Sequence, residues 1–479
     1  MISNALSVVL ILNILFAITI IFLERKKPSA TLAWLMLLVL IPNIGFIFYL
    51  LFGRNLSRKK IFEIKPEEAN KINIILENQK LQLQNNSLKL NDASIKNYKD
   101  MVYMHLTHSE SIFTQNNNID IFTDGNDKFE SLIESIQNAK DHIHMVYFII
   151  KNDSLGKKIV HELTKKAKEG VEVRFLYDAI GSHSLPRNFF KNLKEAGGEA
   201  VAFFPIVIPF LNLNINFRNH RKIAVIDGTE GFIGGFNIGD EYLSLNKKMG
   251  YWRDTHIKIT GDAVHMLQTR FLFDWRSANN KKLEIKPKYF PQINSNGTTG
   301  VQIISSGPDS EWEQIKYGYL KMINAAKESI YIQTPYFIPD ESILHALKLA
   351  SLSGVDVKIM IPNKPDHMFV YWASSSYASE LLKIGAKCYI YEKGFIHAKT
   401  IVVDGKVASV GTANMDVRSF KLNFEVNAFI YDSVISNEFK EIFENDMKDC
   451  TQITQEIYKN RPLMIKFKES ISRLLSPIL

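Results

Sequence analysis

Two apolar stretches without charged side chains begin the chain. No Asp, Glu, Lys or Arg occurs in Met1–Leu23 or in Pro28–Phe52. Each stretch reaches the ~20 residues that a helix needs to cross ~30 Å of hydrocarbon. A cleaved signal peptide would begin with a basic segment, which this N-terminus lacks. We therefore predict a transmembrane hairpin over residues 1–52, with helices at about 2–23 and 30–52.

The charges that flank this hairpin bear on its orientation. The connector Glu24-Arg25-Lys26-Lys27 is short and basic, and a larger basic cluster follows the second helix. The cluster consists of Arg54, Arg58, Lys59 and Lys60. Because basic loops tend to stay in the cytoplasm, the larger cluster favours a multi-pass protein of the cell membrane whose remaining chain is cytoplasmic. The connector alone would favour the opposite orientation.

The rest of the chain contains an internal repeat of helices and strands. Ser131–Tyr177 holds a helical run, a strand, a helix, Gly170 and a second strand. Tyr319–Pro362 has the same order, with Gly354 in the place of Gly170. Strands that alternate with helices indicate βαβ units with right-handed crossovers. The predicted fold class is α/β, with two similar αβα domains in tandem behind the membrane hairpin.

Composition sets the expected domain boundaries. Residues 53–105 are rich in Lys, Glu, Asn and Gln, which indicates a linker or an amphipathic helix near the bilayer, or else a solvated charged helix. Residues 286–300 are rich in Pro, Asn and Gly and are typical of a link between domains. The two domains are therefore expected at 106–285 and 301–479.

Each half carries one copy of the pattern HxKxxxxD. The residues are His220, Lys222 and Asp227 in the first copy, and His397, Lys399 and Asp404 in the second. An asparagine follows each histidine at the same offset, Asn237 in the first half and Asn414 in the second. Two copies at the same place in the repeat, each with its asparagine, indicate shared chemistry rather than coincidence.

The alternation of residues predicts where these side chains point. A period of two along a strand places the His and the Lys of each copy on one face. Asp227 and Asp404 have the opposite parity, and a glycine follows each of them, which is a signal for a hairpin turn. We expect each aspartate to organise the turn and the strand, while the His and the Lys face the site.

These residue types suit a phosphodiester. Lys222 and Lys399 are compact cations for nonbridging phosphate oxygens, and Asn237 and Asn414 add neutral amide donors. A neutral imidazole can attack phosphorus, whereas a protonated one can donate to the leaving alkoxide. One histidine cannot hold both states at once, which explains the need for two copies.

A carboxylate on the far ring nitrogen would fix the tautomer of each histidine. The candidates for this role are Asp254, which follows His220 in the first half, and Glu425, which follows His397 in the second. Asp254 stands further from its histidine along the chain than Glu425 does from its own. Because the spacings differ, Asp254 is the less certain candidate.

Other features narrow the chemistry. The net charge of +8 and the pI of about 9.0 suit an anionic membrane surface or nucleic acid and do not choose between them. His142 and His144 share a strand face without an evident third ligand, so no metal site is expected. The sequence contains no GxxxxGK[ST] motif, so nucleotide-driven chemistry is not indicated. No cofactor is expected.

The sequence resembles the phospholipase D superfamily and, within it, the bacterial cardiolipin synthases. The two HxKxxxxD copies with their trailing asparagines carry the superfamily match. The hairpin and the segments Tyr251–His256, Gln333–Pro339 and Asn414–Ser419 carry the narrower one. The resemblance implies a phosphohistidine intermediate, no metal, and one active site where the two halves meet. It also implies that His220 attacks and that His397 protonates the leaving group.

The function that this resemblance implies is phosphatidyl transfer between two phosphatidylglycerol molecules, which gives cardiolipin and glycerol. The expected partners are phosphatidylglycerol and anionic membrane lipids. The alternative is a membrane-bound phosphodiesterase that hydrolyses phospholipid or, less favoured by two spanning helices, nucleic acid. The residue types do not decide between water and a lipid hydroxyl as the acceptor, and they do not indicate an oligomeric state.

Overall fold

The computed structural model of the protein describes residues 31–32, 34–37, 66–205, 216–279, 283–364 and 366–476. The predicted transmembrane hairpin lies outside the described residues, apart from a short piece between residues 31 and 37. Within the described ranges, none of the helices combines the length and the apolar character that a membrane crossing requires.

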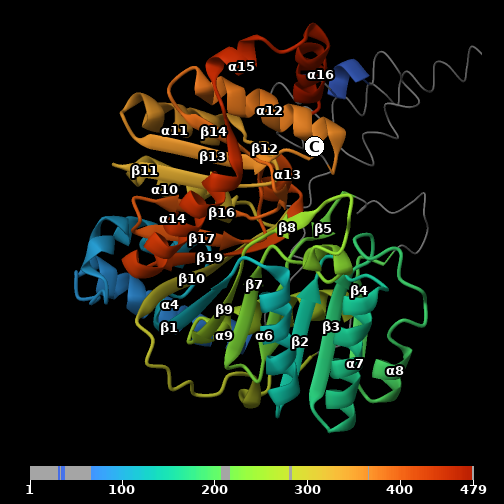
Figure 1. Ribbon diagram of the computed structural model, residues 1–479. Helices are drawn as coiled ribbons and strands as arrows, with labels where there is room; N and C mark the ends of the chain where they lie inside the picture. Colours follow the sequence, from blue (N-terminus) through green and yellow to red (C-terminus); the bar gives the residue numbers. More distant parts are fainter. Residues whose placement is uncertain are drawn as a thin grey trace, which may run out of the picture.

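A single 16-stranded sheet runs through both halves of the molecule (Figure 1). The first half supplies β1 (Thr114–Phe122), β2 (His142–Tyr147), β3 (Glu172–Asp178), β4 (Glu199–Phe203), β5 (Arg218–Asn219), β6 (Ile223–Ile226), β7 (Glu230–Gly234) and β9 (His256–Gly261). The second half supplies β10 (Thr299–Ser306), β11 (Ser329–Gln333), β13 (Asp356–Pro362), β14 (Lys387–Tyr391), β16 (Thr400–Val403), β17 (Val407–Gly411), β19 (Asn423–Tyr431) and β20 (Cys450–Ile453).

The strand order is the same in both halves when it is read outward from the centre. The first half runs β1-β9-β7-β6-β2-β3-β4, and the second runs β10-β19-β17-β16-β11-β13-β14, with β20 added at its edge. The halves join where β1 pairs with β10 in antiparallel register. The predicted α/β tandem repeat is therefore confirmed, and a pseudo-twofold relates the halves.

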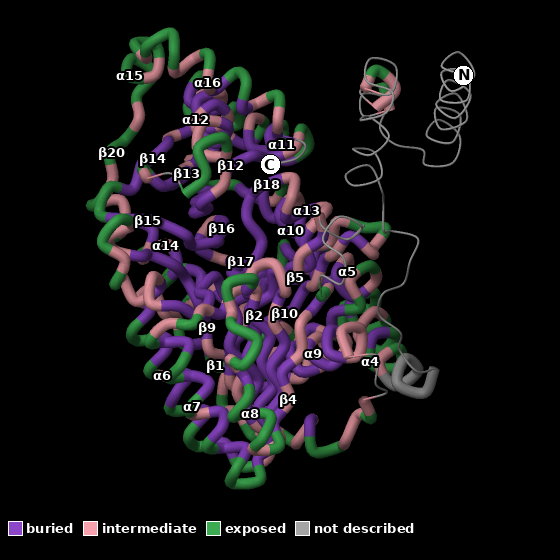
Figure 2. Tube along the Cα trace, turned by 90° about the vertical axis from the view of Figure 1, so that its right-hand side faces the viewer, coloured by how far each residue is buried: buried purple, intermediate pink, exposed green. Residues whose placement is uncertain are grey.

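Helices cover both faces of the sheet. They are α6 (Gly125–Asn138), α7 (Ser154–Lys168), α8 (Lys191–Glu195) and α9 (Val264–Asn279) in the first half, and α10 (Gln314–Ala325), α11 (Glu341–Leu352), α12 (Met368–Leu382), α13 (Val417–Lys421) and α14 (Ser433–Asp446) in the second. Figure 2 shows α6 and α7 on one face and α9 on the other. In α6, Phe129, Leu132 and Ile136 lie on one helical face and are buried, which is how an amphipathic helix packs on a sheet.

The described part of the predicted linker packs into the second half. It forms α4 (Pro66–Gln84), a 3-10 turn at Ala93–Tyr98, and α5 (Lys99–His108). Leu76 and Leu106 are buried in the same core cluster as Tyr319 of α10. At the other end of the chain, α15 (Gln455–Lys459) precedes α16 (Leu463–Leu474), which packs against α12.

Short strands cross from each half to the other at the centre of the molecule. β5 (Arg218–Asn219) of the first half pairs in parallel with the start of β19. β15 (Gly394–Ile396) of the second half pairs in parallel with β8 (Tyr251–Arg253) of the first. A further parallel pair, β12 (Phe337–Ile338) and β18 (Met415–Asp416), lies within the second half. The two crossed pairs fix the positions of the residues that follow β5 and β15.

The motif aspartates hold the far ends of the motif strands. Asp227 accepts hydrogen bonds from the backbone N–H groups of residues 140, 141 and 142 at 2.8–2.9 Å. Asp404 does the same for residues 327, 328 and 329. Both have positive φ, 51° and 55°, which aspartate tolerates better than most residues. The structure thus places both aspartates in the turns, as expected, and neither lines the central cavity.

We expect Asp404→Ala to destabilise the fold. The substitution leaves three backbone donors without their anionic acceptor and places Ala at positive φ, which together should cost about 2–4 kcal/mol. The melting temperature of the detergent-solubilised protein, followed by intrinsic fluorescence, should fall by about 2–4 °C. The matched control is Glu328→Ala, in the segment whose N–H groups bind Asp404, where the carboxylate is exposed and pairs with Lys406. Equal melting temperatures for the two variants would contradict this role.

Candidate active site

One cavity of about 610 Å³ lies where the two halves meet. Both motif histidines, His220 and His397, line it, and so do both motif asparagines, Asn237 and Asn414. Aromatic, charged and amide side chains complete the wall, among them Phe148, Arg218, Trp252, Tyr336, Asp416 and Arg418. The structure therefore brings the two motif copies to a single site.

The crossed strands deliver the two histidines to this cavity. His220 follows β5, and its N–H donates to the carbonyl oxygen of Phe424 in the other half at 3.0 Å. His397 follows β15, and its N–H donates to the carbonyl oxygen of Arg253 at 2.6 Å. Each histidine is thus anchored by backbone of the half that does not contain it.

The carboxylate partners are crossed in the same way. Nδ1 of His220 lies 3.0 and 2.9 Å from the two carboxylate oxygens of Glu425. Nδ1 of His397 lies 2.6 Å from Oδ2 of Asp254. Both carboxylates are completely buried. Both orienting candidates contact a histidine ring, but each serves the histidine of the opposite half.

A local insertion explains the unequal spacing of the two carboxylates. The segment from Asn237 to Asp254 is longer than the corresponding segment from Asn414 to Glu425. The additional residues in the first half include the 3-10 helix η2 (Asp240–Leu243) and the turns before β8. Both carboxylates nevertheless stand directly after the strand segments that pair with β5 and β15.

The two carboxylates occupy different surroundings. Glu425 accepts from the Thr412 hydroxyl at 2.6 Å and from the Asn423 amide at 3.1 Å. The position equivalent to Thr412 is Gly235, where a Cβ would stand only 1.9 Å from Oδ1 of Asp254. A glycine is therefore needed there, because the shorter aspartate lies against the backbone. In the sequence this difference is visible as Gly234-Gly235 before Asn237 and Gly411-Thr412 before Asn414.

Burial sets the proton affinity of the imidazoles. Burial lowers the pKa of His220, Glu425 opposes this and Lys222 lowers it further, to about 4. Burial also lowers the pKa of His397, together with the charge of Lys399 and against that of Asp254. His220 is therefore neutral near pH 7, which is the state that a nucleophile requires.

Both motif lysines are buried, and neither lines the cavity, although the sequence predicts that they face the site. Lys222 is fully buried and donates to the backbone carbonyl of His220 at 2.8 Å, and Lys399 donates in the same way to His397. Burial lowers the pKa of Lys222 to about 7 and that of Lys399 to about 8, although Glu425 and Asp254 oppose the shifts. Near neutral pH each amine can therefore take up a proton when an anion enters the cavity.

The asparagines are held differently in the two halves. Asn237 accepts from the N–H of Ile149 at 3.1 Å and donates to the hydroxyl of Tyr242 at 3.1 Å. Oδ1 of Asn414 is buried and has no hydrogen-bond partner within the part of the chain that the structure describes. The two amides nevertheless border the same cavity as the imidazoles.

The other histidine pair belongs to the core. His142 and His144 pack against each other and contact Oε1 of Gln268 at 3.2 and 3.3 Å. Among the described residues, no group of three or more His, Cys, Asp or Glu side chains is arranged to hold a metal ion.

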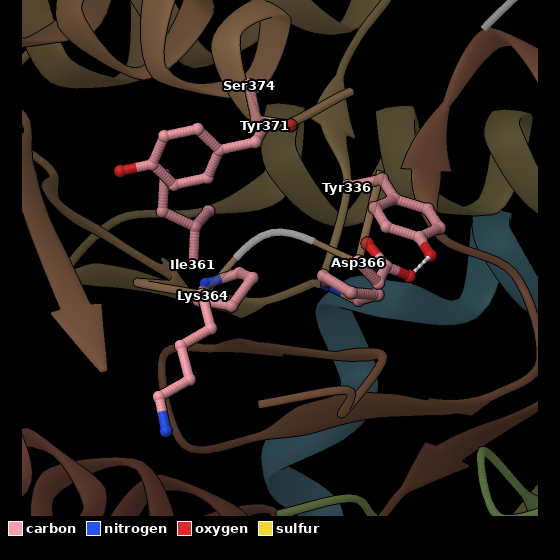
Figure 3. A pocket seen from close by; sticks show the side chains of 8 residues that line it. Tyr336, Ile361, Lys364, Asp366, Tyr371 and Ser374 are labelled. Atoms are coloured by element: carbon pink, nitrogen blue, oxygen red, sulfur yellow. Dashed lines mark hydrogen bonds between the residues drawn. The ribbon is translucent and has the colours of Figure 1, made fainter. Parts of the chain in front are cut away.

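A small hollow adjoins the cavity in the second half (Figure 3). Its volume of about 10 Å³ is too small for a lipid headgroup. Tyr336 and Asp366 border both spaces, and Figure 3 shows the tyrosine hydroxyl directed at the carboxylate, to which it donates a hydrogen bond.

Comparison with known proteins identifies the family. The family model described as "Cardiolipin synthase, PLD-like domain" matches residues 132–275 and 319–447. The major cardiolipin synthase ClsA of Bacillus subtilis is 56% identical over 100% of this chain and 99% of its own. The cardiolipin synthase of Listeria welshimeri is 53% identical over 100% of both chains. The chain belongs to the cardiolipin synthase family.

Two further comparisons bear on the fold and on the N-terminus of this cardiolipin synthase family member. The crystal structure of phosphatidylserine synthase from Haemophilus influenzae aligns with a TM-score of 0.58 at 16% identity and covers 75% of this chain and 95% of that chain. It supports the fold alone. A model described as "Phospholipase_D-nuclease N-terminal" matches residues 11–54, the region of the predicted hairpin. The expected resemblance is confirmed, and the protein is a phosphatidyltransferase of phospholipid biosynthesis.

We expect Glu425→Gln to reduce turnover by about 10²-fold or more while the protein stays folded. Donors surround both oxygens of Glu425, so an amide NH₂ group would face a donor on either side. An amide NH₂ that donates to Nδ1 of His220 would also favour the tautomer in which Nε2 carries the proton and cannot attack. Turnover and melting temperature are measured together. The control is Glu469→Gln, the same change at a buried carboxylate that pairs with Arg461 away from the cavity.

The lysine pKa values predict how substrate affinity depends on pH. A bound phosphodiester favours the charged forms of Lys222 and Lys399. At pH 6 both lysines are already protonated, whereas above about pH 8 they must take up protons when the phosphodiester binds. The KM for the phospholipid donor should therefore rise with pH, by up to about tenfold per unit for each proton taken up. KM is measured in mixed micelles from pH 6.5 to 9.5. A constant KM over this range would contradict the coupling.

Proposed function

We propose that this protein joins two phosphatidylglycerol molecules into cardiolipin through a phosphohistidine intermediate and releases glycerol. The observation that carries the proposal is the pair of imidazoles in one cavity, each with Nδ1 on a buried carboxylate. Nε2 of each ring is then the nitrogen available to the substrate. One phosphodiester is exchanged for another, so the reaction needs no energy-rich cofactor.

In the first step the lone pair on Nε2 of His220 attacks phosphorus. The bond between phosphorus and the glycerol oxygen breaks, and His397 donates its Nε2 proton to that oxygen. The negative charge of the donor phosphate offsets the burial that lowers the pKa of His397, so the proton is present when the substrate is bound. Lys222, Lys399 and the two motif asparagines stabilise the nonbridging oxygens as charge develops.

In the second step the primary hydroxyl of another phosphatidylglycerol enters. It gives its proton to Nε2 of His397, its oxygen bonds to phosphorus, and the bond from phosphorus to His220 breaks. Both imidazoles return to their starting states. Attack by water in place of the lipid hydroxyl would give phosphatidic acid, which is the competing outcome.

The proposal also assigns a location. The predicted hairpin would hold the site at the membrane surface, where donor and acceptor lipids are both concentrated. The basic cluster after residue 53 favours a multi-pass protein with domains 106–285 and 301–479 in the cytoplasm. Phosphatidylglycerol and other anionic membrane lipids are then its partners.

The decisive experiment gives the purified protein labelled phosphatidylglycerol in liposomes. Cardiolipin and free glycerol in equal amounts are expected, and His220→Ala and His397→Ala should each lower turnover to background. The control is His183→Ala, at an exposed histidine outside the cavity. Phosphatidic acid as the sole labelled lipid product would overturn transfer and establish hydrolysis.

A second substrate distinguishes the two histidines. p-Nitrophenol leaves without help from a general acid, so phosphatidyl-p-nitrophenol should restore the first step in His397→Ala. His220→Ala should release no p-nitrophenol, because it has no nucleophile. A burst in His220→Ala and none in His397→Ala would reverse the assigned roles.

A further inference from the structure

The cavity carries different side chains on its two flanks, although the motif residues repeat. Two residues before the motif histidine stands Arg218 in the first half and Phe395 in the second. Four residues after the motif asparagine stands Glu241 in the first half and Arg418 in the second. The pseudo-twofold therefore relates two arginines to a phenylalanine and a glutamate.

Both arginines belong to one flank of the cavity. Arg218 and Arg418 line it, and Nη2 of Arg418 donates to the carbonyl oxygen of Asn216 at 3.0 Å, two residues before Arg218. Burial lowers the pKa of Arg218, and the charge of Arg418 lowers it further, against the opposing effect of Asp178. The two guanidinium groups are thus close enough to repel each other.

The positions that the pseudo-twofold relates to the two arginines carry no unpaired charge, although Lys248 also lines the cavity. The rings of Phe395 and Trp252 lie 5.0 Å apart between centroids and both contact His397. Glu241 forms an ion pair with Lys151 at 2.7 Å. The cationic flank therefore has no counterpart across the pseudo-twofold.

The carboxylates near the arginine pair hold loop backbone. Asp178 accepts from the N–H groups of residues 180, 181 and 219, and Asp416 accepts from the N–H of Ser419 at 2.6 Å. Two arginine guanidinium groups that line one cavity are the arrangement that binds a phosphate.

We propose that Arg218 and Arg418 bind the phosphate of the acceptor phosphatidylglycerol. The inference rests on the proposed transfer reaction, in which the donor phosphate occupies the reacting centre. The acceptor brings a second phosphate, separated from its attacking hydroxyl by three carbons and one ester oxygen. An anion site on one flank places that hydroxyl at the phosphohistidine. The hydroxyl proton passes to the other imidazole, the oxygen bonds to phosphorus, and the bond from phosphorus to nitrogen breaks.

The site selects the acceptor by its charge. Water and uncharged alcohols have no phosphate for the arginines, so they gain nothing from this flank. Phosphatidylglycerol gains a charge-assisted contact that holds its hydroxyl in position. The arginines are positioning residues for the second half of the reaction.

The test is a competition between acceptors. The full-length enzyme in mixed micelles receives labelled phosphatidyl-p-nitrophenol as donor, with phosphatidylglycerol and ethanol as competing acceptors. The ratio of cardiolipin to phosphatidylethanol is measured, which does not depend on how much total activity a variant retains. Arg218→Gln and Arg418→Gln should each lower this ratio by about tenfold, and the double variant should lower it further.

Conservative variants and a control separate charge from structure. Arg418→Lys keeps the charge and should keep most of the ratio. Arg187→Gln, at an exposed arginine outside the cavity, should leave both ratio and rate at the wild-type values. An unchanged ratio in the Gln variants, or an equal loss in Arg418→Lys and Arg418→Gln, would overturn the anion site. Wild-type enzyme that forms no cardiolipin would instead overturn the proposed transfer itself.

Discussion

The site depends on two buried hydrogen bonds between a histidine and a carboxylate, each of which crosses between the halves of the molecule. Glu425 holds His220 and Asp254 holds His397, each from the opposite repeat. Burying a carboxylate is costly unless it is paired and hydrogen-bonded. Neither half alone supplies the carboxylate that orients its own histidine. Packing of the halves and formation of the site are therefore one event, and the backbone contacts of β5 with β19 and of β15 with β8 set its geometry.

The same burial controls when charge is present. Lys222 and Lys399 are buried, and their pKa values are lowered. Both imidazoles prefer the neutral state. A phosphodiester that enters the cavity brings a negative charge, which raises the pKa values of these lysines and imidazoles. The cationic form of the site is thus coupled to the presence of its substrate, and the low dielectric strengthens each contact with the phosphate.

The sequence predicts most of the local structure and little of the pairing between halves. The glycine after each aspartate correctly indicates the turns at Asp227 and Asp404. Period-two alternation places the motif His and Lys on a strand face, whereas in the structure both lie in the short segments just before β6 and β16. The contact between His220 and Glu425 joins residues 205 positions apart, and no local pattern encodes it. Spacing alone made Asp254 an uncertain candidate, because the insertion around η2 shifts its position in the chain but not in space. The core contacts of α4 and α5 were likewise hidden by their polar composition.

The asymmetry around the motifs gives each repeat a distinct task. A perfectly symmetric pair of halves would present identical surroundings to both sides of the bound phosphorus. A transferase must instead release an uncharged glycerol and admit a charged lipid in its place. Arg218 and Arg418 break the symmetry in charge, while Phe395 and Trp252 surround the other histidine with rings. Repetition thus supplies two imidazoles of opposite role, and divergence at positions beside them supplies the means to distinguish water from a second phospholipid.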